Sequence, residues 1–214
     1  MRTYGGATPE ERRAKRRAAL FEAALDLLAD GGWERVTVRG VCTAARLNDR
    51  YFYESFRDPE ALLLAVREEV TAQAFAAIAT AIADTAPDPD VRVRAIVVAV
   101  IDFFTGDPRR GHLLVQSQAT DALRRARHQT IRVMAAIVAE QGVVMLGDEA
   151  PPEPDRELAA LTLVHGTLEL FASWLRGELA VSRAHLTDFL VAMVRTTGDL
   201  ARRLPSTPRS ARTR

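Results

Sequence analysis

The chain has 214 residues, of which 48% are hydrophobic and 27% charged, and its formal net charge at pH 7 is +1. This composition is ordinary for a folded soluble protein with a sizeable core, built as one large domain or as a small domain joined to a larger one. Because the net charge is small, the total charge of the chain does not indicate a nucleic-acid or an acidic partner. Any charged partner must therefore be recognised from local clusters of residues.

Cys42 is the only cysteine of the chain. A single cysteine excludes an internal disulfide framework and a cysteine-based zinc site, and it is typical of a reducing compartment. The N-terminal segment lacks the apolar run of a secretory signal, and no stretch reaches the roughly 20 apolar residues of a membrane span. We therefore expect a cytoplasmic protein with no membrane partner.

Apolar residues recur at spacings of three and four through most of the chain, which predicts an all-α fold. The first helix ends at the glycines of "GGW", and Asp58 followed by Pro59 is a strong start signal for the fourth. The first helix is expected over residues 9–30, and the second is a short helix that starts from Thr37. The third is expected from Asp49 to about Ser55, and the fourth from Pro59 to the break at Pro87 and Pro89. The later ones are expected at about residues 90–105, 108–118, 120–141, 155–177 and 183–204.

The second and third predicted helices are short and joined by a tight turn, which is the arrangement of a helix-turn-helix DNA reader. Phe52 and Phe56 are four residues apart on the third helix, so both can pack inward on one face. Tyr53 and the polar residues beside it must then face outward. The alternative is a surface helix whose charged residues are only solvated.

The outward residues have the chemistry needed for DNA. Arg50 can donate two hydrogen bonds to a guanine edge, Asn48 can pair with an adenine edge or a phosphate, and the Tyr53 hydroxyl can donate to a phosphate. Glu54 could accept a hydrogen bond from cytosine, and Asp49 would have to avoid the phosphates or be hydrogen-bonded.

Residues 17–66 resemble the DNA-binding region of the TetR family of bacterial transcriptional regulators. The resemblance is carried by "ADGGWERVTV" and "VCTAARLNDRYFYESFRDPEALLLAV". The family's pattern of an aromatic residue, tyrosine, a later phenylalanine and a capped helix is matched by Phe52, Tyr53, Phe56, Glu60, Ala61 and Leu62. It implies that Thr37 and Tyr53 contact phosphates and that residues 48–54 read bases. The predicted DNA-binding residues are Thr37, Asn48, Asp49, Arg50, Tyr53 and Glu54.

Four residues depart from the family's pattern. Glu54 and Ser55 occupy positions where histidine or tyrosine is frequent. Arg46 replaces the glycine usual in the turn, where a left-handed backbone would be mildly strained. Pro59 replaces a lysine that often lies near the DNA backbone. A basic segment also begins the first helix, and it is either a solvated helix end or an arm that adds phosphate contacts. This segment contains Arg12, Arg13, Lys15, Arg16 and Arg17.

The last two predicted helices are apolar on more than one side, so they need a burial partner besides their own core. Two such helices from each of two subunits would form a four-helix interface, which is also how TetR-like proteins dimerise. A single buried hairpin is the alternative. The predicted interface residues are Leu161, His165, Leu168, Ala172, Leu186, Phe189, Leu190 and Met193.

A small-molecule pocket in the C-terminal part is implied chiefly by the resemblance. Aromatic residues with a few polar groups among them are the mixture that an apolar pocket uses, although each residue alone also fits an ordinary core. The predicted ligand-binding residues are Phe75, Phe103, Phe104, His112, Gln116, Met134, His165, Phe171 and Trp174.

The sequence gives no sign of catalysis. The histidines lack metal-binding spacing, no glycine-rich phosphate loop is present, and no serine has a nucleophile-elbow setting. We therefore expect no enzyme activity, no metal and no cofactor.

These features predict a helix-turn-helix domain over residues 1–57, with residues 1–8 disordered. A helical ligand-binding and dimerisation domain is expected over residues 58–204, and residues 205–214 form a disordered tail. The predicted function is a repressor that binds a palindromic double-stranded DNA operator as a homodimer and is released by a small molecule, with the fourth helix as the hinge. A constitutive DNA-binding dimer without an inducer, or a helical interaction or enzyme domain with an incidental helix-turn-helix, would be the alternatives.

Overall fold

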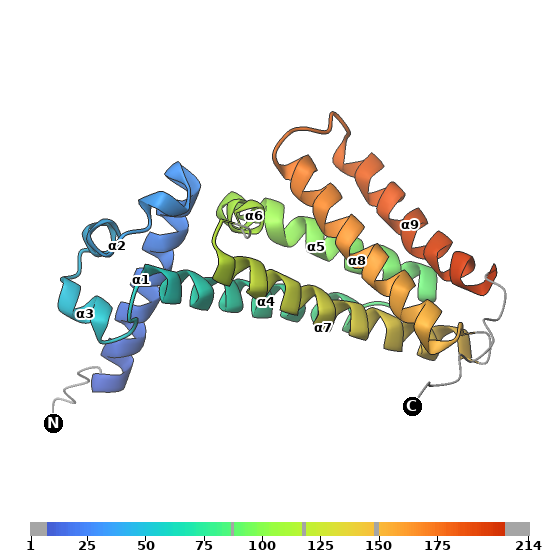
Figure 1. Cartoon of the computed structure of the whole chain (residues 1–214), viewed down its shortest axis with the longest axis horizontal. Helices are drawn as coiled ribbons and strands as arrows, with labels where there is room; N and C mark the ends of the chain where they lie inside the picture. Colours follow the sequence, from blue (N-terminus) through green and yellow to red (C-terminus); the bar gives the residue numbers. More distant parts are fainter. Residues whose placement is uncertain (1–7, 87, 117–118, 148–149, 204–214) are drawn as a thin grey trace, which may run out of the picture. The chain divides into compact units, whose positions relative to one another are not determined.

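A computed structural model describes residues 8–86, 88–116, 119–147 and 150–203. The described residues form α-helices and one 3-10 helix, with no strand among them, so the all-α prediction is confirmed (Figure 1). The elements are α1 (Pro9–Gly31), η1 (Trp33–Arg35), α2 (Val38–Ala45), α3 (Asp49–Tyr53), α4 (Pro59–Ala83), α5 (Pro89–Gly106), α6 (Pro108–Val115), α7 (Asp121–Leu146), α8 (Glu153–Leu175) and α9 (Arg183–Arg203).

Helix α1 begins with a capping box. The Thr8 hydroxyl accepts a hydrogen bond from the backbone N–H of Glu11 at 3.1 Å, and the Glu11 carboxylate accepts one from the backbone N–H of Thr8 at 2.7 Å. These bonds satisfy N–H groups that a helix start leaves without partners. The disorder predicted for residues 1–8 is therefore wrong at Thr8. The rest of that segment, and the predicted tail at 205–214, lie outside the described residues.

The turn between α2 and α3 is left-handed at Arg46, with φ 54° and ψ 41°. Arg46 is the only residue other than glycine with positive φ in the described part of the chain. Its backbone N–H still donates to the carbonyls of Cys42 and Thr43, so the conformation completes the end of α2. The turn therefore has the left-handed backbone conformation that glycine favours, although the residue is an arginine.

Helix α7 is longer than the sequence predicts. It continues to Leu146, although a loop was expected from Gly142 onward. A glycine inside a helix costs only about 1 kcal/mol relative to alanine, and the apolar residues after it maintain the helical pattern. The prediction of a loop directly after residue 141 is therefore wrong.

The chain divides into two compact units, each formed by segments distant in sequence. Unit 1 comprises residues 1–79 and 102–126, and unit 2 comprises residues 80–101 and 127–214. Helix α4 therefore belongs partly to each unit. This division follows packing, whereas the boundary near residue 57 is a prediction about function and stays one.

Unit 1 has a single hydrophobic core. Leu20, Leu28, Val41 and Phe52 are at its centre, and Leu113 of α6 belongs to the same cluster. Helix α6 is also tied to α1 by Arg109, whose guanidinium donates to Glu22 at 2.9 Å and to Asp26 at 2.7 Å. The helix-turn-helix is thus part of a larger packed body that includes α6.

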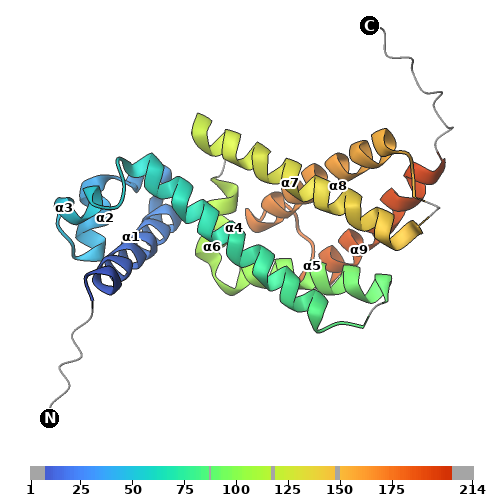
Figure 2. The ribbon, with the colours of Figure 1, turned by 90° about the horizontal axis from the view of Figure 1, so that it is seen from below.

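Unit 2 is a helical bundle in which α8 and α9 pack against each other (Figure 2). Ile131 and Ala135 of α7 form a core with Ala160 and Val164 of α8. Two ion pairs join α5 to α9, Arg94 to Asp188 and Arg195 to Asp90, each at 2.8 Å. 

Helix α8 is the one helix, among the residues described, that is long and apolar enough by length and composition to cross a membrane. It packs instead as a bundle helix, with Val164 in the core of unit 2 and Glu169 paired to Arg127 of α7 at 3.2 Å.

Candidate nucleic-acid interface

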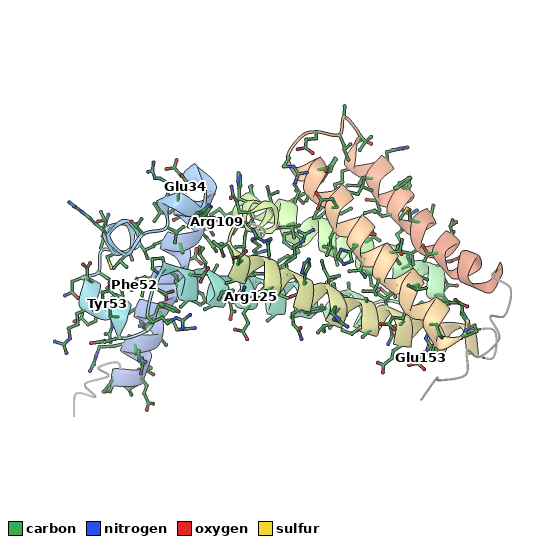
Figure 3. The ribbon with its side chains drawn as sticks, viewed as in Figure 1. Glu34, Phe52, Tyr53, Arg109, Arg125 and Glu153 are labelled. Carbon is green, nitrogen blue, oxygen red and sulfur yellow. The ribbon has the colours of Figure 1, made fainter. Side chains whose placement is uncertain are left out.

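Helix α3 has an inner apolar face and an outer polar face. Phe52 and Phe56 are buried, and the Phe56 ring lies 5.9 Å from that of Phe52 and 5.8 Å from that of Phe21 on α1. Tyr53 is 59% exposed, whereas its neighbour Phe52 is fully buried (Figure 3). Since Arg50 is exposed too, the predicted separation of the two faces is confirmed.

Two side chains predicted to contact DNA are also helix caps. The Thr37 hydroxyl accepts a hydrogen bond from the backbone N–H of Gly40 at 3.1 Å, and the Asn48 side-chain oxygen accepts one from Tyr51 at 3.3 Å. Each cap uses an acceptor and leaves the donor, a hydroxyl or an amide NH₂, available. Because Thr37 and Asn48 are exposed, these donors can reach an external acceptor such as phosphate.

Asp49, at the start of α3, interacts with the buried thiol of Cys42 on α2. Burial raises the pKa of Cys42 to about 11, and the hydrogen bond to Asp49 and its negative charge act in the same direction. A thiol with this pKa stays protonated and donates to the carboxylate at neutral pH. Asp49 is therefore hydrogen-bonded within the fold, as a carboxylate close to phosphates would need to be.

Glu54, at the end of α3, is surrounded by three arginines. Its carboxylate lies 3.2 Å from Arg50 and 3.5 Å from Arg16, and its backbone carbonyl accepts a hydrogen bond from Arg13 at 2.8 Å. Arg13 and Arg16 come from α1, about 40 residues earlier in the chain. The carboxylate is thus held by positive charge on both sides.

The basic half of α1 packs on the aromatic side chains of the helix-turn-helix. The guanidinium of Arg16 lies 4.4 Å from the centre of the Tyr51 ring, and that of Arg17 lies 4.5 Å from the centre of the Phe56 ring. Such cation–π contacts contribute about 0.5–1 kcal/mol each at exposed sites. The sequence analysis missed this role. The four-residue spacing of Arg17 and Phe21 signals only the contact inside α1, where the Arg17 guanidinium lies 5.0 Å from the centre of the Phe21 ring.

The structure divides the predicted ligand-binding residues between the two units. Phe103 and Phe104 pack on the core of unit 1, and Phe171 is buried in unit 2, where its ring stacks on that of Trp174 at 5.8 Å. His112 and His165 are exposed. Unit 1 contains Phe75, Phe103, Phe104, His112 and Gln116, and unit 2 contains Met134, His165, Phe171 and Trp174. The ligand site therefore stays a prediction.

The predicted dimer residues differ in how accessible they are. Ala172, Leu186 and Leu190 are buried within unit 2 of the single chain, so their burial does not fit the interface role predicted for them. The others remain at least partly accessible: Leu161, His165, Leu168, Phe189 and Met193. The sequence analysis missed Leu158, which lies on the same stripe of α8 and is 63% exposed.

Acidic, histidine and cysteine side chains do not gather into a metal site in the described part of the chain. No group of three or more of them lies close enough together to hold an ion there.

Comparisons with known proteins find one family match, and it covers the N-terminal helices. Residues 20–66 match the family described as bacterial regulatory proteins, tetR family. No curated protein sequence is significantly similar to the chain.

Several solved structures have the same fold at low sequence identity. A structure described as a transcriptional regulator from Pseudomonas aeruginosa PAO1 has a TM-score of 0.75 and 19% identity, over 92% of this chain and 99% of that one. A TetR-like transcriptional regulator from Rhodococcus sp. RHA1 has a TM-score of 0.67 and 18% identity, over 85% of this chain and 94% of that one. The transcriptional regulator FadR from Bacillus subtilis, in complex with stearoyl-CoA, has a TM-score of 0.64 and 18% identity, over 87% of this chain and 97% of that one. Residues 20–66 thus match the tetR family of bacterial regulatory proteins, and the chain as a whole shares the fold of these solved transcriptional regulators.

Proposed function

We propose that this protein is a cytoplasmic transcriptional repressor that binds a palindromic DNA operator as a homodimer and is released by a small molecule. The observation that carries the proposal is the division of α3. Two phenylalanines anchor the helix in the core of unit 1, and Asn48, Arg50 and Tyr53 are left on the surface.

The exposed side chains are suited to two kinds of DNA contact, with phosphates and with bases. Thr37, Asn48 and Tyr53 offer neutral donors, which position a protein on phosphates without reading sequence. Arg50 has the planar pair of donors that matches the O6 and N7 atoms of guanine in the major groove. One arginine base contact of this kind discriminates against a wrong base by about 1–3 kcal/mol.

The DNA-binding part of the proposal is tested by selecting bound duplexes from random DNA. The wild-type protein should enrich a palindrome, and Arg50→Ala should change the base preference at one position of each half-site. Tyr53→Phe should weaken binding to all sequences alike, because it removes a phosphate contact. Tyr51→Phe is the matched control, since it deletes the same hydroxyl from a half-buried ring under Arg16 and should change little. Enrichment of no sequence by the wild-type protein would refute operator binding.

The dimer is supported by apolar side chains left exposed on α8 and α9. Leu158 and Phe189 are 63% and 45% exposed, which is unusual for large apolar residues unless another surface covers them. A two-fold dimer would set two α3 helices about one DNA turn apart, roughly 34 Å, as a palindromic operator requires.

Sedimentation at micromolar concentration tests the dimer. Phe189→Glu should shift the wild-type dimer to monomer, because it would bury a charge in the interface. Val144→Glu places the same charge on α7, at an apolar residue that is 77% exposed, and should leave the dimer intact. A wild-type protein that sediments as a monomer contradicts this part of the proposal.

A small apolar molecule is the effector that we propose. FadR from Bacillus subtilis, which shares the fold, was solved with stearoyl-CoA, and the predicted ligand residues of this chain are mainly aromatic. An effector releases DNA only if it binds one conformation better, and a coupling of 1–3 kcal/mol would weaken operator binding about 5- to 150-fold. Stearoyl-CoA can be added to the protein–operator complex, with coenzyme A as control. An unchanged operator affinity would exclude long-chain acyl-CoA as the effector.

A further inference from the structure

Glu54, at the end of α3, differs from the exposed residues before it because its carboxylate is already engaged in ion pairs within the protein. Its two carboxylate oxygens already have separate partners: Oε1 lies 3.2 Å from Nε of Arg50, and Oε2 lies 3.5 Å from a terminal nitrogen of Arg16. Arg13 in turn donates to the backbone carbonyl of Glu54 at 2.8 Å. A carboxylate paired on both oxygens is poorly placed to accept a hydrogen bond from cytosine, which is the role that the sequence suggested.

The two ion pairs of Glu54 differ in exposure. The Arg16 side chain is 25% exposed and also covers the Tyr51 ring at 4.4 Å, so it is held from two directions. The Arg50 side chain is 83% exposed and has Glu54 as its charged partner one helical turn away. Arginine placed before glutamate at this spacing is the less favourable order in a helix. Two arginines of α1 thus hold Glu54 at a partly covered site, whereas its hydrogen bond to Arg50 is open to solvent.

A loose pair of this kind changes an equilibrium constant by a small factor. Exposed pairs measured in other proteins correspond to about 1.4- to 5-fold. A factor of this size is enough to keep Arg50 paired with Glu54 when the alternative is water or a poorly placed phosphate. The factor is too small to keep the pair together when a guanine edge offers Arg50 two well-aligned acceptors.

We propose that Glu54 is a positioning residue that restrains Arg50, so that Arg50 contributes to binding of the correct sequence and little to binding of random DNA. The inference rests on the proposed DNA-binding function. Arg16 fixes the Glu54 carboxylate, and the carboxylate holds Arg50 along α3 until a base edge replaces it. The residue thereby raises the ratio of specific to non-specific affinity without contacting a base.

The test is the salt dependence of binding to random-sequence duplex DNA. Each phosphate neutralised by an arginine adds about 0.9 to the slope of log affinity against log salt. Glu54→Gln should free Arg50 for phosphate, steepen this slope by about 0.9 per subunit and tighten non-specific binding about 1.4- to 5-fold per subunit. Glu34→Gln is the control, since it removes the same charge from η1, just after the opposite end of α1 from Arg13 and Arg16, and should leave the slope unchanged (Figure 3).

Arg50→Gln gives a second test that does not depend on how the Glu54 variant folds. If Arg50 is restrained in the non-specific complex, its removal leaves the non-specific slope at the wild-type value. Affinity for the selected operator should instead fall about 5- to 150-fold per half-site, because the arginine contacts a guanine edge there. A lower non-specific slope for Arg50→Gln would mean that Arg50 contacts phosphates freely, and it would overturn the inference.

The other outcomes are equally distinct. Glu54→Gln with a lower melting temperature and an unchanged non-specific slope would make Glu54 a structural residue only. A loss of preference for cytosine at one operator position would make it a base reader. Either result overturns the inference and leaves the proposed function intact. Failure of the wild-type protein to bind any duplex at about 50 mM salt would instead refute the proposed function, because phosphate contacts are strongest there.

Discussion

The rings of Phe52 and Tyr53 meet edge to face with their centroids 5.5 Å apart, yet Phe52 is fully buried and Tyr53 is 59% exposed. Consecutive residues of a helix point about 100° apart, so two neighbours can lie on opposite sides of the boundary between core and solvent. The buried ring fixes the position of α3, and the exposed ring takes its orientation from it.

Substitution of these two residues should separate stability from DNA binding. Phe52→Ala should lower the free energy of unfolding by about 3–5 kcal/mol, because it leaves a cavity in the core of unit 1. Tyr53→Phe should change that free energy by less than about 0.5 kcal/mol and still weaken DNA binding. Urea unfolding monitored by circular dichroism, together with a binding titration, checks both. Equal losses of stability in the two variants would contradict the assignment of the faces.

Arg46→Gly should stabilise the protein. Arg46 has a left-handed backbone, which costs a residue with a Cβ atom roughly 1–2 kcal/mol, whereas glycine adopts it freely. Part of the gain is offset by the greater freedom of glycine in the unfolded chain, so we expect a net increase of about 1 kcal/mol or less. Arg39→Gly is the control inside α2, and it should cost about 1 kcal/mol. The midpoints of denaturant unfolding should therefore move in opposite directions.

Gly40→Ala should destabilise the start of α2. A Cβ atom at this position would lie 2.9 Å from the backbone carbonyl oxygen of Arg35 and 3.1 Å from the Thr37 hydroxyl. The backbone cannot move away without disturbing the cap, so we expect a loss of about 1–3 kcal/mol, as in other overpacked sites. Gly142→Ala, where a Cβ atom meets nothing within 4 Å, should instead add up to about 1 kcal/mol to α7. A neutral Gly40 variant would show that the turn before α2 is easily displaced.

Acid should weaken the start of α6, where Asp107 is the N-cap. The hydrogen bond from Arg109 holds the pKa of Asp107 below its usual value, and burial opposes this only in part. A lowered pKa contributes stability that is present above the unfolded value of about 3.9 and is lost as the pH falls through the folded value. Asp107→Asn keeps a capping side chain but removes the charge, so it should cost about 1 kcal/mol at pH 7 and nothing at low pH. Unfolding free energies measured from pH 7 down to pH 3 test this, with Asp30→Asn as a surface control.

Cys42 should be unreactive in the folded protein. Burial and the neighbouring Asp49 raise its pKa to about 11, so almost no thiolate is present at pH 8. A raised pKa contributes stability that is complete below the unfolded value and is lost as the pH rises toward 11. The loss should be about 1 kcal/mol at pH 10 and should vanish in Cys42→Ala. Rapid reaction with a disulfide reagent at pH 8, under native conditions, would contradict the burial of this thiol.

Local patterns were enough to predict most of the helices. The start of α4 followed from Asp58 and Pro59, and α2 and α3 begin directly after Thr37 and at Asp49, where the sequence placed them. The end of α7 could not be predicted from Gly142, because a glycine weakens a helix without ending it. In this chain, local sequence signals therefore predict the first residue of a helix better than its last residue.

What the sequence determined by itself is the direction in which side chains of one helix point, since helical periodicity puts Phe52 and Phe56 on one face and Tyr53 on the other. Only the tertiary structure decided which residues meet across the chain. It brought Arg16 to Glu54 and Arg109 to Asp26, and it buried Leu186 inside unit 2. Periodicity describes a single helix, whereas the partner of each face is chosen by the packing of helices that lie far apart in sequence, and that choice does not appear in any local pattern.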